Sequence, residues 1–359
     1  LGFVSLSKRF TALKKTDAYL WLSEVASVPL QQSLKDLDVA FRNFFSSMTD
    51  NRKGPKVQMP RFKKRSSAQS ARFVGTAFKI DQKLKLAKIG SIKVKWSREL
   101  PSEPSSVTVI KDAAGRYFAS FVIEVAPKLL PWAEKTCGVD LGITTFATLD
   151  DGTKVDAPKP LRRHLKKLAR LQKALSRCEK GSNRRHRARL KVAKVHARIK
   201  DIRTDFLHKL STRLIRENQS ISLEDLNVSG LLKNRKLSKA ISDLGWRQFR
   251  TLLKAKAERY GREVAVISRW EPTSQTCSCC GEKSLQKKAG LAGLQIREWS
   301  CSNCGSFHDR DVNAAKNIKV AGGRLDTQNG RRRASQSSLL AVPVDASSHP
   351  CEVQLRLCL

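Results

Sequence analysis

The sequence is poor in acidic residues for its length. Its 359 residues include 32 Asp and Glu against 70 Lys and Arg, which gives a formal net charge of +38. A charge of this size opposes compaction and favours polyanionic partners. Ribosomal and chromatin proteins share this imbalance, so the charge indicates a nucleic-acid-binding protein without saying what is done to the nucleic acid.

Long apolar runs and an ordered set of disulfide-forming cysteines are also missing. No apolar run is long enough to span a bilayer, and the first residues lack the layout of a signal peptide. The nine cysteines show no framework spacing, which favours a reducing compartment. We therefore expect a soluble protein that is not exported. Because the chain begins with Leu rather than Met, we also expect its natural N-terminus to be missing or processed.

Four of the cysteines have the spacing of a metal site. Two C-x-x-C pairs stand with 20 residues between them: Cys277 with Cys280, and Cys301 with Cys304. Four thiolates at this spacing can close a tetrahedral site around zinc, so the sequence predicts a zinc ribbon. Cys279 would be a spare thiol in the first pair. His308 is expected on the surface or behind the ligands, because four thiolates already suffice.

The first third of the chain changes from helical to alternating patterns. Residues 10–48 have helical periodicity, with a break predicted at Pro29, and residues 78–125 alternate as antiparallel strands of a small barrel or sheet. The region 51–72 between them is a basic loop able to lie along phosphates. The residues of this loop that we expect to bind nucleic acid are Arg52, Lys53, Lys63, Lys64 and Arg65.

The middle of the chain predicts an α/β layer with mixed strand directions. A hairpin-like unit spans 136–152, and two short strands follow at 220–226 and 263–268. The region 159–200 holds 17 Lys or Arg and one acidic residue, in a helical pair. Like charges four residues apart destabilise a free helix, which implies an anionic partner. We expect nucleic acid to bind at Arg162, Arg163, Lys166, Lys167, Arg184 and Arg185.

Three acids stand near the ends of predicted strands or the start of a helix. They are Asp140, Glu224 and Asp311, separated by 84 and 87 residues. Clustered carboxylates repel one another unless a cation neutralises them, and two Mg²⁺ ions would do so while activating water against a phosphodiester. Spacing alone leaves open that each acid is an ordinary turn or cap residue.

Three segments resemble the RuvC blocks of the TnpB (OrfB) proteins of insertion sequences, which are relatives of type V CRISPR nucleases. They are CGVDLG at 137–142, LEDL at 223–226, and HDRDVNAAKNI at 308–318 after the cysteine pairs. The helix around 31–37 is also similar to the N-terminal helical part of this family. The resemblance covers about 1–322.

The resemblance implies an α/β plus β architecture. An RNase H-like RuvC nuclease domain with a zinc-ribbon insertion would follow a small β-barrel, or wedge, that carries a helical insertion. The expected parts are a helical recognition segment at 1–50, a wedge-like domain at 51–130, a RuvC domain with the basic hairpin at 131–270, the ribbon at 271–307, the last RuvC block at 308–322 and a disordered tail at 323–359. Family members begin with a further strand and helix, so the wedge is expected to lack a strand.

In function, the resemblance implies an RNA-guided, metal-dependent DNA endonuclease encoded by an insertion sequence, of a kind long described as transposases. Asp140, Glu224 and Asp311 would be catalytic and hold Mg²⁺, and the four cysteines would hold a structural Zn²⁺. The family motif places the last ligand two residues before Asn313, which selects Asp311 over Asp309. The implied partners are a guide RNA from the transposon end and double-stranded target DNA, in the cytoplasm of a prokaryote at the nucleoid.

Three other functions fit the same residues. A catalytically weak RNA-guided DNA-binding protein would share the ribbon and the charge, although it would be expected to lack one of the three acids. A strand-transfer transposase could use the same metal chemistry. A plain zinc-ribbon RNA-binding protein would make no metal-dependent cut.

Overall fold

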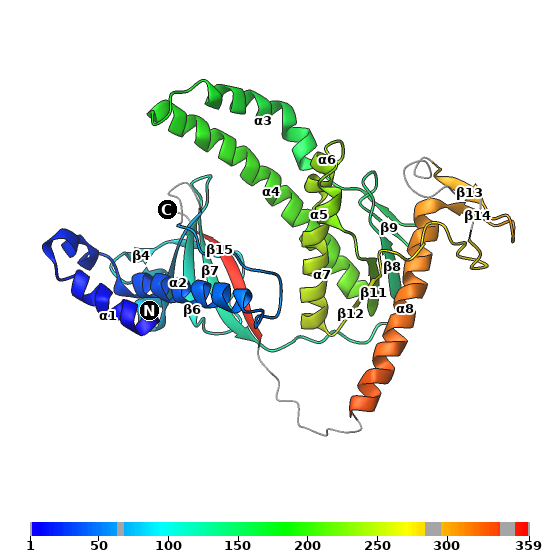
Figure 1. Cartoon of the computed structure of the whole chain (residues 1–359), viewed down its shortest axis with the longest axis horizontal. Coiled ribbons are helices and arrows are strands. Elements are labelled where there is room, and N and C mark those ends of the chain that lie inside the picture. The colour runs from blue at the N-terminus through cyan, green and yellow to red at the C-terminus, as the bar shows by residue number, and fades with distance from the viewer. Residues whose placement is uncertain (1, 63–67, 284–295, 338–348, 358–359) are drawn as a thin grey trace. The chain divides into compact units, whose positions relative to one another are not determined.

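The computed structural model describes residues 2–62, 68–283, 296–337 and 349–357 (Figure 1). The chain divides into two compact units: Leu1–Ala126 with Ala346–Leu359, and Pro127–Asp345. Each unit combines helices with β-structure, so the predicted mixed α/β character is confirmed. Within the described ranges, no helix has both the length and the apolar character needed to cross a bilayer.

The first unit opens with three helical segments: α1 (Phe3–Leu13), the 3₁₀ helix η1 (Asp17–Ser23) and α2 (Ser27–Met48). The predicted break at Pro29 is wrong. Pro29 lies inside α2, as its third residue. A proline is tolerated in the first turn, where its missing N–H would have no partner. Phe41 and Phe44 are half-buried and Leu37 is exposed, so the apolar stripe of α2 is only partly covered.

The antiparallel strands predicted over 78–125 are present. One sheet has the order β1-β6-β7-β15-β5, and a second has the order β2-β3-β4 after the short 3₁₀ helix η2 (Gly75–Ala77). Their bounds are β1 Gln69–Val74, β2 Phe78–Ile80, β3 Leu84–Leu86, β4 Gly90–Ile92, β5 Val94–Lys95, β6 Ser106–Lys111, β7 Tyr117–Val125 and β15 His349–Leu357. Phe73, Leu84, Val107 and Phe121 are buried in a common core.

In the described parts of 323–359, which are 323–337 and 349–357, the structure differs from the disordered tail that we expected. Helix α8 (Arg310–Ser337) runs on through its first part, and β15 pairs with β7 along nine residues. The sequence signal for β15 is the alternation of Cys351, Val353, Leu355 and Leu357 with polar residues, a strand pattern too short to weigh against the polar residues before it.

The second unit is built on a sheet of order β10-β9-β8-β11-β12. The bounds are β8 Thr136–Asp140, β9 Ala147–Leu149, β10 Lys154–Val155, β11 Ser220–Glu224 and β12 Glu263–Ile267. Strand β11 runs parallel to both β8 and β12, whereas β9 is antiparallel to β8 and β10 to β9. The predicted layer with mixed strand directions is therefore confirmed.

Helices cover both faces of this sheet (Figure 1). They are α3 Pro160–Ser176, α4 Asn183–Glu217, α5 Val228–Leu231, α6 Ser238–Leu244, α7 Trp246–Tyr260 and α8. Val139 and Leu223 belong to one buried core with Leu207 of α4 and Phe249 of α7. Neighbouring residues on a strand point to opposite faces, so Gly138 lies under α8 on the other side.

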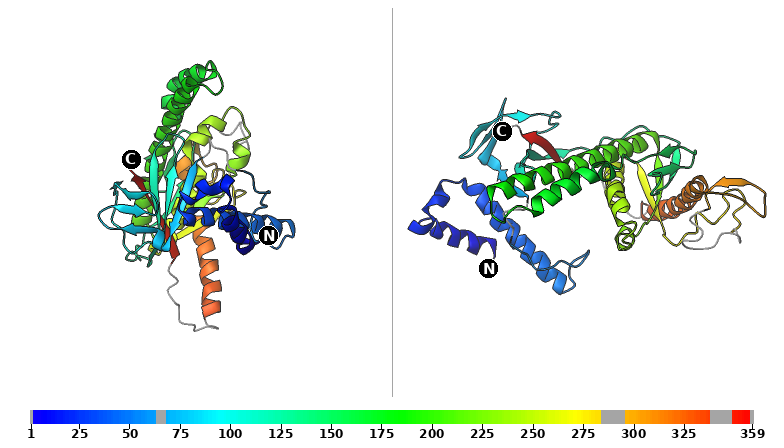
Figure 2. Two further views of the ribbon diagram at one scale, coloured as in Figure 1. Left: turned by 90° about the vertical axis from the view of Figure 1, so that its left-hand side faces the viewer. Right: turned by 90° about the horizontal axis from the view of Figure 1, so that it is seen from above.

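The basic region 159–200 forms the predicted helical pair. Helices α3 and α4 run side by side as a hairpin (Figure 2). Leu168 of α3 packs with Val195 and Ile199 of α4 in a small core of its own. The apolar stripe predicted along α4 is thus confirmed, because its first part forms this seam and Leu210 reaches the core of the sheet.

Candidate functional site

Two of the three acids end neighbouring parallel strands. Asp140 is the last residue of β8, and Glu224 is the last residue of β11. In the ladder between these strands Val139 lies opposite Leu223, so the two acids follow at the next position. The carboxyl ends of parallel strands meet at one edge of a sheet. Both carboxylates therefore lie at this edge.

Asp311 reaches the same edge from α8. It is the second residue of the helix, which begins directly after β14 (Phe307–Asp309). Asp309 Oδ1 accepts hydrogen bonds of 3.0 Å from the backbone N–H groups of Asp311 and Val312, and Asp309 Oδ2 lies 2.7 Å from Lys154 Nζ. Asp309 is thus committed to capping α8 and to an ion pair.

Asp140 feels the charges of both other acids. Burial, together with the negative charges of Glu224 and Asp311, raises the pKa of Asp140 to about 8. Burial also raises the pKa of Glu224. Carboxylates that oppose each other's ionisation form a site that a hard divalent cation stabilises, because oxygen atoms are the ligands such cations prefer.

The carboxylate cluster is looser than the cysteine cluster. Among the described residues, the groups whose ligand atoms all lie within 4.8 Å are made of ribbon residues. Asp311 also faces a positive charge from the ribbon, since its two oxygens lie 3.3 and 3.4 Å from Arg297 Nη1. A cation shared by the three acids would have to draw their oxygens together and compete with Arg297.

The backbone of helix α8 packs directly against the backbone of the sheet. A Cβ atom at Gly138 would overlap the carbonyl oxygen of Ala315 and come within 2.7 Å of the backbone nitrogen of Lys319. A Cβ at Gly322, seven residues further along the helix than Ala315, would overlap the hydroxyl of Ser222 on β11. Two glycines therefore permit the close approach that brings Asp311 to the sheet edge.

The four cysteines predicted to bind zinc lie together. Their sulfur atoms are all within 4.8 Å of one another, with 3.6 Å between Cys277 and Cys304 and 3.6 Å between Cys280 and Cys301. The hydroxyl and backbone N–H of Ser306 lower the pKa of Cys304 to about 6, which favours the thiolate that a metal needs. The short strand β13 (Glu298–Ser300) pairs with β14 beside this cluster.

His308 is not a surface residue. It is buried, and its Nε2 lies 3.0 Å from the sulfur of Cys277. It also belongs to a second group of possible ligands with Cys277 and the exposed Cys279. A position directly behind Cys277 agrees with the alternative that places His308 behind the ligands, and the surface position is wrong.

Residues outside the predicted set connect these parts. Thr273 donates a hydrogen bond to Glu224, and Asn313 and Asn317 of α8 donate to backbone carbonyls at the start of the ribbon. Lys319 of α8 pairs with Asp150 after β9. These contacts join residues that lie far apart in the chain, so no local pattern could have found them.

The basic residues of the hairpin are mostly exposed. Arg162, Arg163, Lys166, Lys167 and Arg184 are all exposed. The guanidinium of Arg185 instead donates to the carbonyl oxygens of Leu175 and Cys178 at 3.2 and 2.8 Å. Arg185 therefore holds the hairpin turn together.

In the N-terminal loop, Lys53 is exposed and Arg52 donates to the carbonyl oxygen of Pro55 at 2.9 Å. Lys63, Lys64 and Arg65 lie outside the described residues.

Two family models match the second unit and its surroundings. One, described as a probable transposase of the OrfB_IS605 type, matches residues 120–235, and the other, the Cas12f1-like TNB domain, matches residues 246–318. Together they cover the regions that carry Asp140, Glu224, the cysteines and Asp311.

Whole-chain relatives extend these matches. A protein of Streptomyces pristinaespiralis, provisionally named an RNA-guided DNA endonuclease, is 46% identical over 90% of this chain and 78% of its own length. InsQ of Escherichia coli K12, with the same provisional name, is 34% identical over 84% of this chain and 76% of its own length. A solved Cas12f1–guide RNA–target DNA complex has a TM-score of 0.45 at 13% identity, over 81% of this chain and 70% of that one.

The acids that end β8 and β11 and the cysteine ribbon between β12 and α8 define a nuclease-like α/β protein with an inserted cysteine cluster that could hold a metal ion. The chain belongs to the TnpB (OrfB) family of insertion-sequence proteins.

Proposed function

We propose that this protein is an RNA-guided, metal-dependent DNA endonuclease encoded by an insertion sequence. The observation that supports the proposal is that Asp140 and Glu224 end neighbouring parallel strands, while the negative charge of Asp311, at the start of α8, contributes to the raised pKa of Asp140. The names of the relatives from Streptomyces and Escherichia coli agree with it.

The topology supports an RNase H-like RuvC domain. Numbered within the second unit, the strands lie in the order 3-2-1-4-5, with the second strand antiparallel to the first. The acids end the first strand, end the fourth strand and begin the helix packed across both. We assign the first unit to the wedge-like domain with its helical recognition segment, whose sheets are consistent with that role.

In this mechanism Asp140, Glu224 and Asp311 would hold Mg²⁺. When bound, the ions would supply an activated water and stabilise the leaving 3′-oxygen. Asp140 must release its proton to become a ligand, and the positive charges of Arg310 and Arg297 favour that release. Asp140 and Glu224 are half-buried, which reduces the access of water to the site. The four cysteines would hold Zn²⁺ as a structural ion that fixes the ribbon beside α8.

The hairpin α3–α4 would bind the phosphates of a guide RNA–DNA heteroduplex. Its exposed cations suit contacts with phosphates, which recognise the shape of the backbone. Sequence choice would then rest with the RNA, for which we propose an origin in the transposon end, and the target would be double-stranded DNA.

The test is a cleavage assay with purified protein, its co-purifying RNA and end-labelled duplex DNA. Asp140→Asn should lower the cleavage rate by about 1,000-fold while leaving DNA binding nearly intact, because several kcal/mol of charge stabilisation are lost. The exposed Asp205 of α4 provides the matched control, Asp205→Asn.

Three outcomes separate the candidate functions. Hydrolysed ends that depend on Mg²⁺ support the endonuclease, and joined products indicate strand transfer. Guided DNA binding with no cut by the wild-type protein indicates a binding protein, and either of the last two results refutes the proposal.

A further inference from the structure

We infer that Thr273 is a positioning residue that ties the cysteine ribbon to two of the three acids, Glu224 and Asp311. The inference rests on the proposed nuclease function, because it assigns these acids to the reaction.

The side chain of Thr273 contacts Glu224 directly. Its hydroxyl Oγ1 donates a hydrogen bond of 2.5 Å to Glu224 Oε1. Thr273 is only 5% exposed, and it lies between the end of β12 and the first cysteine of the ribbon. A glutamate has three side-chain torsions, so a fixed donor at one oxygen restricts the directions in which the other can point.

The backbone of Thr273 contacts α8. Asn317 Nδ2 lies 2.7 Å from the carbonyl oxygen of Thr273 and 2.7 Å from that of Thr276. Asn313 Nδ2 donates to the carbonyl of Thr276 at 2.8 Å, and its Oδ1 accepts the backbone N–H of Ser278 at 2.9 Å. These asparagines lie two and six residues after Asp311 on the same helix.

The start of the ribbon therefore forms a clasp, defined here as Thr273, Thr276, Asn313 and Asn317. One end of the clasp holds Glu224 through a hydroxyl, and the other end holds the first turns of α8 through two amides. Asn313 is 1% exposed, so its amide has no access to water as an alternative partner. A shift of the ribbon would move both acids relative to Asp140.

The hydroxyl of Thr273 is specific to this contact. Within the described part of the chain, the hydroxyl of the neighbouring Thr276 makes a local bond, to the carbonyl oxygen of Pro272 at 3.0 Å. Both threonines offer their backbone carbonyls to α8, so replacing either side chain by valine keeps those contacts. Thr276→Val is therefore a matched control for Thr273→Val: both variants lose a hydroxyl, but only Thr273→Val loses the hydrogen bond to Glu224.

The experiment compares Thr273→Val, Thr273→Ser and Thr276→Val in cleavage at saturating RNA and DNA, over a range of Mg²⁺ concentration. Valine keeps the shape and the branched Cβ of threonine but removes the donor. Thr273→Val should lower the maximal rate about 10- to 100-fold and raise the half-saturating Mg²⁺ concentration, as expected when a partner of a metal ligand is lost. The maximal rates of Thr273→Ser and Thr276→Val should stay within about threefold of the wild-type rate, a much smaller change than the loss expected for Thr273→Val.

Two results would overturn the inference. One is a Thr273→Val protein that cuts with wild-type rate and wild-type Mg²⁺ dependence. The other is a loss that serine does not rescue and that Thr276→Val shares in equal measure, because it would show a purely structural effect of the loop.

A second readout keeps the inference separate from the proposed function. Binding of Mn²⁺ to the protein–RNA complex, followed by electron paramagnetic resonance, should weaken in Thr273→Val and not in Thr276→Val. If the wild-type protein cuts no DNA, the proposed function fails. The inference about Thr273 is then decided by this metal-binding difference, and equal Mn²⁺ binding by both variants refutes it.

Discussion

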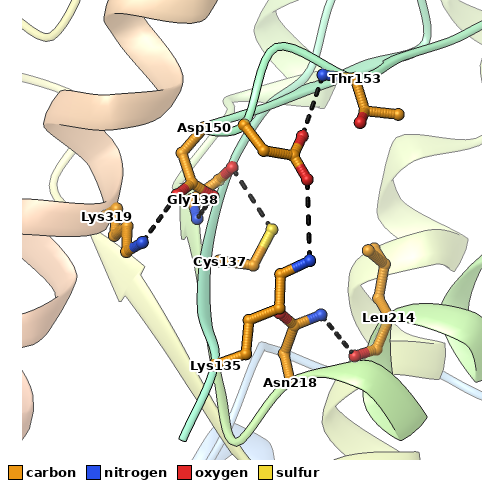
Figure 3. A network of polar contacts seen from close by, with 9 residues as sticks. Lys135, Cys137, Gly138, Asp150, Thr153, Leu214, Asn218 and Lys319 are labelled. Atoms are coloured by element: carbon orange, nitrogen blue, oxygen red, sulfur yellow. Dashed lines mark hydrogen bonds and ion pairs between the residues drawn. The ribbon is translucent and has the colours of Figure 1, made fainter.

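Lys319 Nζ lies 2.7 Å from Asp150 Oδ2, and this ion pair joins α8 to the residue that follows β9. The other oxygen of Asp150 accepts a hydrogen bond of 3.0 Å from the backbone N–H of Gly138 (Figure 3). One carboxylate thus connects β8, the end of β9 and α8. Because Asp140 ends β8 and Asp311 is the second residue of α8, this ion pair helps to fix the two acids relative to each other.

Removing the charge of Lys319 should loosen this connection. The side chain of Asp150 is 14% exposed, so Lys319→Met leaves a largely buried carboxylate without its cationic partner, although the bond from Gly138 remains. We expect the free energy of unfolding to fall by about 1–3 kcal/mol. Chemical denaturation measures the change, with Lys316→Met at an exposed position of the same helix as control. Equal stability of the two variants would contradict the assigned role.

Two adjacent glycines on α8 should respond to alanine in opposite ways. A Cβ at Gly322 would overlap Ser222 on β11, whereas a Cβ at Gly323 meets nothing within 4 Å. We therefore expect Gly322→Ala to destabilise the protein by about 1–3 kcal/mol through overpacking. Gly323→Ala should stabilise it by about 0.5–1 kcal/mol, because alanine favours the helix. Thermal unfolding of both variants measures the difference, and stabilisation by Gly322→Ala as well would show that α8 lies further from the sheet.

Lys256 should make stability depend on alkaline pH. It lies between α7 and α4 with its ammonium 2.7 Å from the hydroxyls of Ser211 and Thr212, and burial lowers its pKa to about 8. The unfolded chain, with the ordinary value of 10.5, binds more protons above pH 8. The contribution of Lys256 to stability should therefore rise between about pH 8 and 10.5.

The measurement is the difference in denaturant midpoint between wild type and Lys256→Met across this pH range. Lys254→Met, at an exposed position of α7, supplies the control for other groups that titrate there. A wild-type curve parallel to that of Lys256→Met would show that the pKa of Lys256 is not lowered.

The two possible ligand sets at the ribbon predict different zinc contents for the same cysteine variants. With four thiolates as ligands, Cys301→Ser should lose bound zinc and Cys279→Ser should keep one ion per chain. With Cys277, Cys279 and His308 as ligands, Cys279→Ser should instead lose the zinc and Cys301→Ser should keep it. Zinc content by mass spectrometry of the purified proteins separates the sets. We expect the four-thiolate result, because two C-x-x-C pairs close a tetrahedral site without help from His308.

Local patterns made much of the fold predictable from sequence. Alternating residues predicted the strands over 78–125, and the apolar stripe predicted α4. The cysteine spacing predicted the cluster because each C-x-x-C pair can offer two thiolates to one metal ion, and two such pairs complete a tetrahedral site. The break at Pro29 failed because a proline is equally compatible with the first turn of a helix and with its end.

The connections between these parts were not predictable. Spacing alone did not decide whether Asp140, Glu224 and Asp311 meet, and the resemblance to a family supplied that expectation. The bond from Thr273 to Glu224 spans 49 residues and the pair of Lys319 with Asp150 spans 169. Threonine and lysine are common surface residues, so only the packing of α8 on the sheet gives these two a distinct role.

The hairpin α3–α4 carries its own seam of Leu168, Val195 and Ile199, apart from the larger core beneath the sheet. Its outer turns can therefore be lengthened, shortened or exchanged between relatives without repacking the strands that end in Asp140 and Glu224. The length of nucleic acid that the hairpin can contact and the reaction at the acids are therefore separable properties. Evolution or a protein engineer can change one without the other.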